Sequence, residues 1–332
     1  MGKKQNRTVF IASGIATILL ILVIYSLSTY TGSAGADSVV SVILIPKVID
    51  EDNDFWGAIT EGAKLAAQER NIDLTIMATD TETDVEGQNR IIEEAIEKKP
   101  NAIVLAPSAY EETVPYARKI QEAGIKLVII DSKLSENLGA AFVATDNVEG
   151  GRKMSEYVKD KLDADSVIGI VGHVKGTSTA VEREQGIREG LGQYESQIAD
   201  VVFCDSSYSK AFQVTYDMIR AHPDMNFIFG LNEYSAVGAA RAVKAMGLEH
   251  QITMVGFDSS LEEVEMLEAG VFDAIVVQRP MNMGYLGVSM AYQISLSTEM
   301  PQDIDSGSVL ITSDTIYTEE NQKLLFPFRE SN

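Results

Sequence analysis

Phe55 and Trp56 form an aromatic pair directly after an apolar strand, and Trp56 is the only tryptophan of the chain. The loop that leads to them contains acids and an amide, Asp50 to Asn53. A sugar ring can stack its apolar C–H face on an aromatic ring, while its hydroxyl groups need charged or amide partners. The pair and its loop therefore favour carbohydrate binding.

Further polar side chains follow the apolar strands of the rest of the chain, namely Asp131, Asn232, Asp258 and Gln278. In open α/β sheets, ligands bind beyond the carboxyl ends of the strands. A carboxylate can accept two hydroxyl groups, and an amide can both donate and accept. We expect these side chains to meet around one polyhydroxylated ligand.

The elements that must position these residues alternate strictly between strand and helix. Short, uninterrupted Val/Ile/Leu strands are typical of parallel sheets covered on both faces. A first block of strands is predicted at 38–46, 73–79, 101–107 and 125–131. The pattern starts again at 167 and continues to a helix over 281–297 and a strand over 309–317. The sequence predicts an α/β fold with two doubly wound parallel-sheet lobes, joined by several segments because no Gly/Ser or Pro linker separates them.

Charge and composition exclude some classes of function. The 332 residues carry a formal net charge of −22, which disfavours binding to nucleic acid or to anionic lipid. The single Cys204 cannot form an internal disulfide, and we interpret it as a buried small residue. The three histidines, His173, His222 and His250, lack metal-ligand spacing and are interpreted as structural. We expect no metal site, no cofactor and no catalytic group.

The N-terminus predicts a hydrophobic helix used for export. Three basic residues precede an uncharged stretch over 9–30, and Ala34-Gly35-Ala36 fits a signal-peptide cleavage site. Residues 1–36 are either a cleaved signal peptide or an uncleaved anchor that tethers the protein through 9–30. Both alternatives place Asp37 onward outside the cytoplasm. N-terminal sequencing of the exported protein separates them, since a soluble chain that begins at Asp37 contradicts the anchor.

Several short motifs follow one another along the chain, each at one place. They are Phe55-Trp56-Gly57 with Glu61-Gly62-Ala63, Ala144-Thr145-Asp146-Asn147, Gly176-Thr177-Ser178 with Glu182-Arg183-Glu184, Asn232-Glu233, Val255-Gly256-Phe257-Asp258, and Gln278-Arg279-Pro280. From Val42 to Pro280 the chain resembles the ribose/galactose class of periplasmic sugar-binding proteins. These share the type I periplasmic binding fold with the ligand-binding domain of lac-repressor-type regulators.

The resemblance implies a set of sugar contacts. They fall on Asn53, Phe55, Trp56, Asp131, Arg183, Asn232, Asp258 and Gln278, and Lys47 could add a charged donor. Ser132-Lys133 follows Asp131 where the ribose-binding members usually have an arginine, which argues against ribose itself. The aromatic residue of the second lobe remains open between Tyr208 and Phe212.

The resemblance also implies two lobes that close on a three-segment hinge. The N-terminal lobe would comprise 38–145 plus 279–306 and the C-terminal lobe 146–278 plus 307–332. The implied function is capture of a monosaccharide or similar small polyol by a monomer, which presents it to an ABC-type sugar permease. An anchored sugar sensor that signals through a histidine kinase or chemoreceptor is the alternative. An enzyme using Asp131 and Asp258 as a carboxylate pair is a more distant one.

Each candidate residue also has a structural interpretation. Phe55 and Trp56 could cap the core, Asp131 a turn, Asn232 its own helix and Asp258 the helix that starts near Leu261. Arg183, next to Glu182 and Glu184, could form a solvated ion pair. Gln278 could belong to the hinge alone.

Overall fold

The computed structural model describes residues 39–296 and 303–326. The helix expected over 9–30 and the choice between signal peptide and anchor lie outside the described residues. Within the described ranges, no helix is both long and apolar enough to cross a bilayer.

Two six-stranded sheets organise the described chain. The first has the order β11-β5-β4-β3-β1-β2, and its strands are β1 (Ser41–Ile45), β2 (Asp73–Ile76), β3 (Ala102–Leu105), β4 (Lys126–Ile130), β5 (Ala141–Ala144) and β11 (Ile304–Asp305). The second has the order β12-β10-β9-β8-β6-β7, and its strands are β6 (Ile168–Gly172), β7 (Ile198–Phe203), β8 (Phe227–Gly230), β9 (Thr253–Phe257), β10 (Ala274–Val277) and β12 (Val309–Thr312). All pairings are parallel except β10 with β12.

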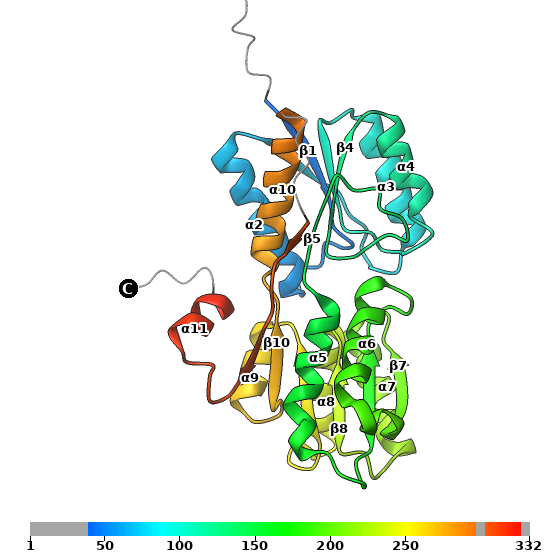
Figure 1. Cartoon of the computed structure of the whole chain (residues 1–332), viewed down its shortest axis with the longest axis vertical. Helices are drawn as coiled ribbons and strands as arrows, with labels where there is room; N and C mark the ends of the chain where they lie inside the picture. Colours follow the sequence, from blue (N-terminus) through cyan, green and yellow to red (C-terminus); the bar gives the residue numbers. More distant parts are fainter. Residues whose placement is uncertain (1–38, 297–302, 327–332) are drawn as a thin grey trace, which may run out of the picture. The chain divides into compact units, whose positions relative to one another are not determined.

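Helices cover both faces of each sheet, as Figure 1 shows. In the first, α2 (Asp54–Arg70) and α10 (Pro280–Leu296) share one core with the sheet, and α3 (Val85–Glu97) and α4 (Val114–Glu122) share the other. In the second, α5 (Asn147–Val158) and α6 (Ser178–Leu191) lie on one face. On the opposite face lie α7 (Tyr208–Ala221), α8 (Glu233–Ala245) and α9 (Leu261–Glu268). We call these two assemblies the first and the second lobe.

The chain passes between the lobes at three places: between β5 and α5, between β10 and α10, and between β11 and β12. The predicted fold class, two parallel-sheet α/β lobes, is confirmed. Strands such as β3 and β10 are buried at every position, which is why they have uninterrupted apolar sequences rather than alternating ones.

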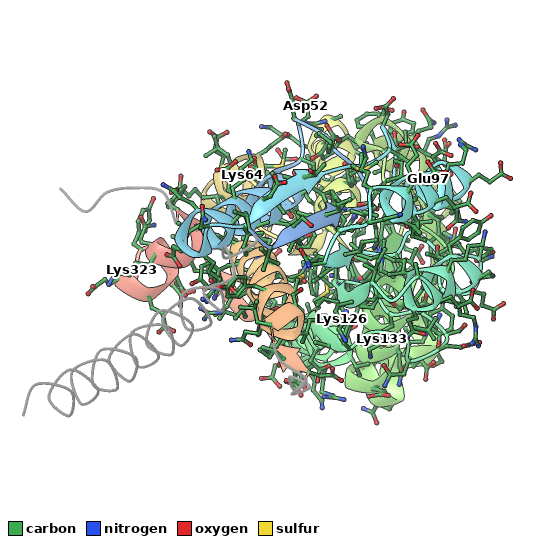
Figure 2. The ribbon with its side chains drawn as sticks, turned by 90° about the horizontal axis from the view of Figure 1, so that it is seen from above. Asp52, Lys64, Glu97, Lys126, Lys133 and Lys323 are labelled. Carbon is green, nitrogen blue, oxygen red and sulfur yellow. The ribbon has the colours of Figure 1, made fainter. Side chains whose placement is uncertain are left out.

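Several elements differ from the prediction, and the strands β5 and β11 of the first sheet were not predicted at all. The strand predicted over 309–317 ends at Thr312, and a turn leads into a short helix, α11 (Glu319–Leu325), where Thr318 is the N-cap. The helix α5 was not predicted as an element, although Asp146 caps it by accepting from Glu149 N. Charged side chains such as Lys64, Glu97 and Lys126 are exposed, and Figure 2 shows Asp52 at the edge of the molecule.

Glycines allow α5 and α6 to touch backbone to backbone. A Cβ on Gly186 of α6 would lie 2.0 Å from the carbonyl oxygen of Val148 in α5, and one on Gly151 would lie 2.1 Å from the carbonyl oxygen of Arg183. Since these carbonyl groups belong to helix backbones, neither contact can be relieved by a side-chain rotation. The packing therefore fixes the position of the helix that carries Arg183.

We predict that Gly186→Ala lowers the free energy of unfolding by about 1–3 kcal/mol, because the added methyl group forces the two helices apart. Gly57→Ala is the matched control, since a Cβ there has no neighbouring atom within 4 Å; it should be neutral or stabilising by about 0.5–1 kcal/mol. Urea denaturation measures both. Equal stability of the two variants would contradict the close packing.

Candidate ligand-binding site

The nine residues predicted to bind a ligand all line one cavity between the two lobes. The lining consists of Lys47, Asn53, Phe55, Trp56, Glu82, Asp131, His173, Thr179, Arg183, Asn232, Glu233, Tyr234, Asp258 and Gln278. The cavity has a volume of about 20 Å³, which is room for about one water molecule. A sugar ring therefore needs the lobes or the lining side chains to move apart before it can enter.

The aromatic pair contributes to both the core and the cavity. The Phe55 and Trp56 rings meet edge to face, with centroids 5.1 Å apart and an interplanar angle of 84°. Trp56 is 3% exposed and packs within the core of the first lobe, while its Nε1 donates to Glu82 Oε1 at 2.6 Å. Asn53 accepts from Trp56 N at 3.1 Å and so caps α2. The Trp56 side chain thus belongs to the core of the first lobe and also lines the cavity.

Asp131 and Asp258 are held in unusual backbone conformations directly after β4 and β9. Their φ angles are +61° and +90°, a region that costs non-glycine residues about 1–3 kcal/mol and is concentrated at functional sites. Asp131 is buried and pairs with Lys47 Nζ at 2.8 Å. It also accepts from Ser132 Oγ at 2.7 Å. The strain and the pairing together fix this carboxylate at the wall of the cavity.

Asp258 joins two other lining residues and does not cap α9. Its two oxygens accept from Gln278 Nε2 at 2.6 Å and from Glu233 N at 2.9 Å. Ser260, not Asp258, caps α9. Burial raises the pKa of Asp258, and the nearby Arg183 opposes that rise. These bonds hold the Asp258 carboxylate in the wall of the cavity.

Arg183 is a buried cation, so its interpretation as part of a solvated ion pair is wrong. It is 3% exposed, and its guanidinium lies 3.8 Å from the centroid of the Phe257 ring. Nε donates to Asn147 Oδ1 at 2.8 Å and Nη1 to Leu231 O at 2.6 Å. Burial lowers the pKa of Arg183, while Asp258 and other carboxylates raise it. These contacts leave part of its fork of donors for the cavity.

Asn232 keeps the structural role that was its alternative. Its Oδ1 accepts from Ser235 N at 3.0 Å, and Ser235 Oγ returns the bond by accepting from Asn232 N at 2.9 Å. This capping box starts α8 and fixes the position of the Asn232 side chain. Its role as a cap does not prevent it from lining the cavity.

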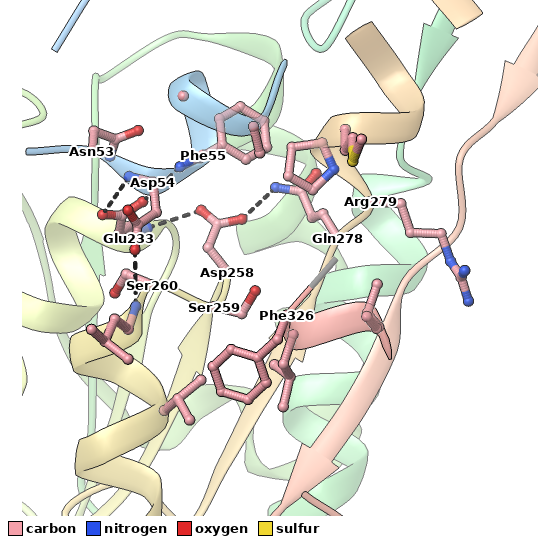
Figure 3. Close-up of a pocket in the computed structure, with 18 of the residues that line it drawn as sticks. Asn53, Asp54, Phe55, Glu233, Asp258, Ser259, Ser260, Gln278, Arg279 and Phe326 are labelled. Carbon is pink, nitrogen blue, oxygen red and sulfur yellow. Dashed lines mark hydrogen bonds between the residues drawn. The ribbon is translucent and has the colours of Figure 1, made fainter. Parts of the chain in front are cut away.

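Glu233 joins the two lobes beside the cavity. From the second lobe, its carboxylate accepts from Asp54 N at 3.2 Å and from Phe55 N at 3.1 Å, at the start of α2 in the first lobe. In return, Asp54 Oδ2 accepts from Leu261 N at the start of α9, at 2.9 Å. Figure 3 shows this cluster next to the Asp258–Gln278 bond. Each lobe thus supplies an acid to a helix N-terminus of the other, where the helix dipole favours negative charge.

A larger groove of about 840 Å³ borders the cavity on one side. The two spaces share the residues Asn53, Phe55, Glu233, Asp258 and Gln278. Beyond them the groove is lined by the crossover that contains Arg279, by the end of α11 and by Phe326, which follows that helix (Figure 3). The shared residues are therefore the wall between the groove and the cavity.

Five lining residues were missed by the sequence prediction: Glu82, His173, Thr179, Glu233 and Tyr234. His173 follows an apolar strand directly, which is the signal that singled out Asp131 and Asp258, so it could have been found. The open choice of a second-lobe aromatic has another outcome. Tyr208 and Phe212 line a neighbouring hollow but not the cavity, whereas Tyr234 lines both.

Two lobes of parallel sheet, with a polar cavity between them, define a two-lobed binding protein. A family model described as a periplasmic binding protein domain matches residues 42–298. The chain belongs to this family, and the resemblance inferred from the motifs is confirmed. Membership places the described part of the protein outside the cytoplasm.

Individual relatives agree with this assignment. The chain is 28% identical over 265 residues to the D-ribose/D-allose-binding protein of Pseudomonas aeruginosa, covering 77% of this chain and 83% of the relative. Among solved structures, it is similar to a sugar transporter from Clostridium phytofermentans, at 42% identity and a TM-score of 0.78, covering 82% and 99% of the two chains. It is also similar to an ABC transporter solute-binding protein from Agrobacterium vitis with bound D-fucose, at 29% identity and a TM-score of 0.81, covering 86% and 99%.

We predict that Lys47→Met lowers the free energy of unfolding by about 3–5 kcal/mol, because it leaves the Asp131 carboxylate buried without its cation. Lys47→Met combined with Asp131→Asn should recover much of that loss, since asparagine removes the charge and tolerates the positive φ. Urea denaturation measures both. As a control, Lys64→Met breaks an exposed pair with Glu61 and should cost about 0–1 kcal/mol. A single variant no less stable than this control would contradict the buried pair.

Proposed function

We propose that the protein captures a neutral monosaccharide, or a similar small polyol, in the cavity between its lobes and presents it to an ABC-type sugar permease. The observation that carries the proposal is the cavity itself, where an aromatic pair, two strained carboxylates and a buried arginine converge from both lobes. Such a set matches a ring with one apolar face and several hydroxyl groups. Family membership and the sugar-related names of the relatives support the same function.

Each predicted residue has a role in this proposal. Phe55 and Trp56 stack on the ring, Asp131 and Asp258 accept hydroxyl groups, and Arg183 donates to ring or hydroxyl oxygens. The amides Asn53, Asn232 and Gln278 and the ammonium of Lys47 complete the contacts. Because a buried hydroxyl group without a partner is costly, this wall of fixed partners rejects the wrong epimer.

We further propose that the lobes comprise 38–145 plus 279–306 and 146–278 plus 307–332, and that they hinge on the three crossing segments. A sugar that contacts both lobes stabilises the closed form through its differential affinity for that form. The small volume of the cavity supports this motion, since the closed arrangement has no entry for a ring.

We propose that the protein acts as a monomer and delivers the sugar to a permease without turning it over. A tether through residues 9–30, and with it signalling through a histidine kinase or chemoreceptor, depends on residues outside the described part. The relative crystallised with D-fucose is named as a solute-binding protein of an ABC transporter, which supports transport.

We expect Trp56 fluorescence of residues 37–332 to change saturably with at least one sugar in a panel of pentoses, hexoses and related polyols. Asp258→Asn should weaken that sugar about 10- to 100-fold, because a hydrogen bond to a buried charged group is lost, and Asp258→Ala should weaken it further. Glu262→Gln is the control, since it alters only an exposed pair with Arg241. Unchanged affinity in both Asp258 variants would remove this carboxylate from the site.

We also predict that sugar affinity falls as pH rises from about 5 to 8. Burial between the closed lobes raises the pKa of Glu233 to about 8, whereas with the lobes apart it should have its ordinary value. Closure then takes up a proton in this window, so affinity is highest below the window and levels off above pH 8. Titration calorimetry in buffers of different ionisation enthalpy measures the uptake.

Glu233→Gln should remove most of this dependence, because glutamine cannot ionise. The other groups around Glu233, namely Tyr208, Asp258, Glu263 and Asp54, remain, and Asp258 and Glu263 also have raised pKa values. A residual slope is therefore expected. A slope as steep as that of the unaltered protein would show that Glu233 does not titrate on closure.

A further inference from the structure

His173 lies where the strand order of the second sheet reverses. It follows β6 directly, and β6 has β7 on one side and β8 on the other. Ligands of open α/β sheets bind at such reversal points. The corresponding strand of the first sheet is β1, between β2 and β3, and the residue beyond its end that lines the cavity is Lys47. Lys47 and His173 thus each follow the strand at the reversal point of their own sheet, by two residues and by one, and both line the cavity.

One ring nitrogen of His173 is held by a chain of hydroxyl groups. Nε2 lies 2.8 Å from Thr179 Oγ1. Nε2 also lies 3.3 Å from Thr177 Oγ1, and the Thr177 hydroxyl donates to the carbonyl oxygen of Val174 at 2.9 Å. Because that carbonyl oxygen takes the single hydroxyl proton of Thr177, Thr177 Oγ1 can only accept from Nε2. Nε2 therefore carries the proton, which leaves Nδ1 as an acceptor.

The ring is also neutral. It is 2% exposed, and burial together with the nearby cations Arg183 and Lys47 holds the pKa of His173 well below its usual value. A protonated Nδ1 would have to donate, but no acceptor for it is present among the described residues. The unpaired lone pair of Nδ1 thus persists across the physiological pH range.

Nδ1 has no hydrogen-bond partner within the described part of the chain. Only one other lining residue has such an unpaired buried atom in that part, Gln278, whose Nε2 is used by Asp258 while Oε1 is free. A buried acceptor without a donor is destabilising, and such groups in native proteins call for an explanation. A ligand hydroxyl group provides the missing donor, whereas an ionised carboxylate or phosphate does not.

We propose that His173 Nδ1 accepts a hydrogen bond from one hydroxyl group of the bound ligand and selects ligands that carry a hydroxyl at that position. This inference rests on the proposed sugar binding and adds a specificity-determining residue to it. With Gln278 Oε1 as a second free acceptor, the cavity favours uncharged, hydroxyl-rich ligands over sugar acids and sugar phosphates. The buried carboxylates Asp131 and Asp258 disfavour anions in the same way.

The test compares three variants that separate the two ring nitrogens. His173→Gln places an amide near Nε2 and keeps the contact with Thr179, His173→Asn places one near Nδ1, and His173→Phe removes both. Binding of D-ribose, D-allose and D-fucose is measured by Trp56 fluorescence, and urea denaturation checks folding. For the sugar that binds the unaltered protein, we expect a loss of about 5- to 100-fold in the Gln and Phe variants and a smaller loss in the Asn variant.

Monodeoxy analogues of that sugar locate the contact. One analogue should bind the unaltered protein more weakly, and it should lose nothing further in His173→Gln, because both changes remove the same bond. Thr215→Val is the matched control, since Thr215 Oγ1 is an unpaired buried atom of the second lobe that does not line the cavity. Its affinity should be unchanged.

Nitrogen NMR of the three histidines gives a readout that is independent of the variants' stability. In the unaltered protein, the signal assigned to Nδ1 of His173 should be that of an unprotonated nitrogen and should shift when the sugar is added. His173→Gln within twofold of the unaltered protein, or an Nδ1 signal indifferent to a bound sugar, would overturn the inference and leave the proposed function standing. Failure of every sugar and polyol to bind the unaltered protein would overturn both.

Discussion

The structure depends on one constraint: charged and polar groups at the carboxyl ends of the strands are buried, so each must find a partner there. Lys47 pairs with Asp131, Gln278 and the Glu233 backbone hold Asp258, and Arg183 bonds to Asn147 and Leu231. A buried charge without such partners would cost several kcal/mol. The two lobes can close over this cluster because nearly all of its members are satisfied when they meet.

The sequence was sufficient for the fold because the strands are short and buried on both faces. Such strands can be recognised from apolar runs alone, as for β3 and β10, and their alternation with helices implies parallel sheets. Among the elements that the pattern missed, two have weaker signals. The helix α5 begins with polar residues and two glycines, and α11 follows a strand whose apolar character fades into a turn.

Residues of the site differed in how far they could be predicted, for physical reasons. Asp131 and Asp258 stand directly after apolar strands, so their place at the sheet edge follows from the strand itself. Glu82 lies in the loop between β2 and α3 and reaches the cavity through its bond to Trp56 Nε1, a contact that depends on tertiary packing. His173 was not selected as a lining residue because a lone histidine was considered for metal ligation and not for its position directly after β6.

A cavity already filled with internal bonds changes what affinity means for this protein. A sugar hydroxyl that binds Asp258 competes with Gln278, and one that binds Asp131 competes with Lys47, so each exchange replaces one bond by another. Exchanges of that kind contribute little net free energy when the match is good and cost much when a partner is left over.

Discrimination between sugars then rests on the groups that gain a bond rather than exchange one. In the described part of the chain, the unpaired acceptors of His173 and Gln278 are such groups, and the apolar face offered by Phe55 and Trp56 adds stacking that needs no exchange. The binding free energy of the correct ligand should therefore be concentrated in these few contacts, with the carboxylates mainly rejecting ligands that cannot replace their present partners.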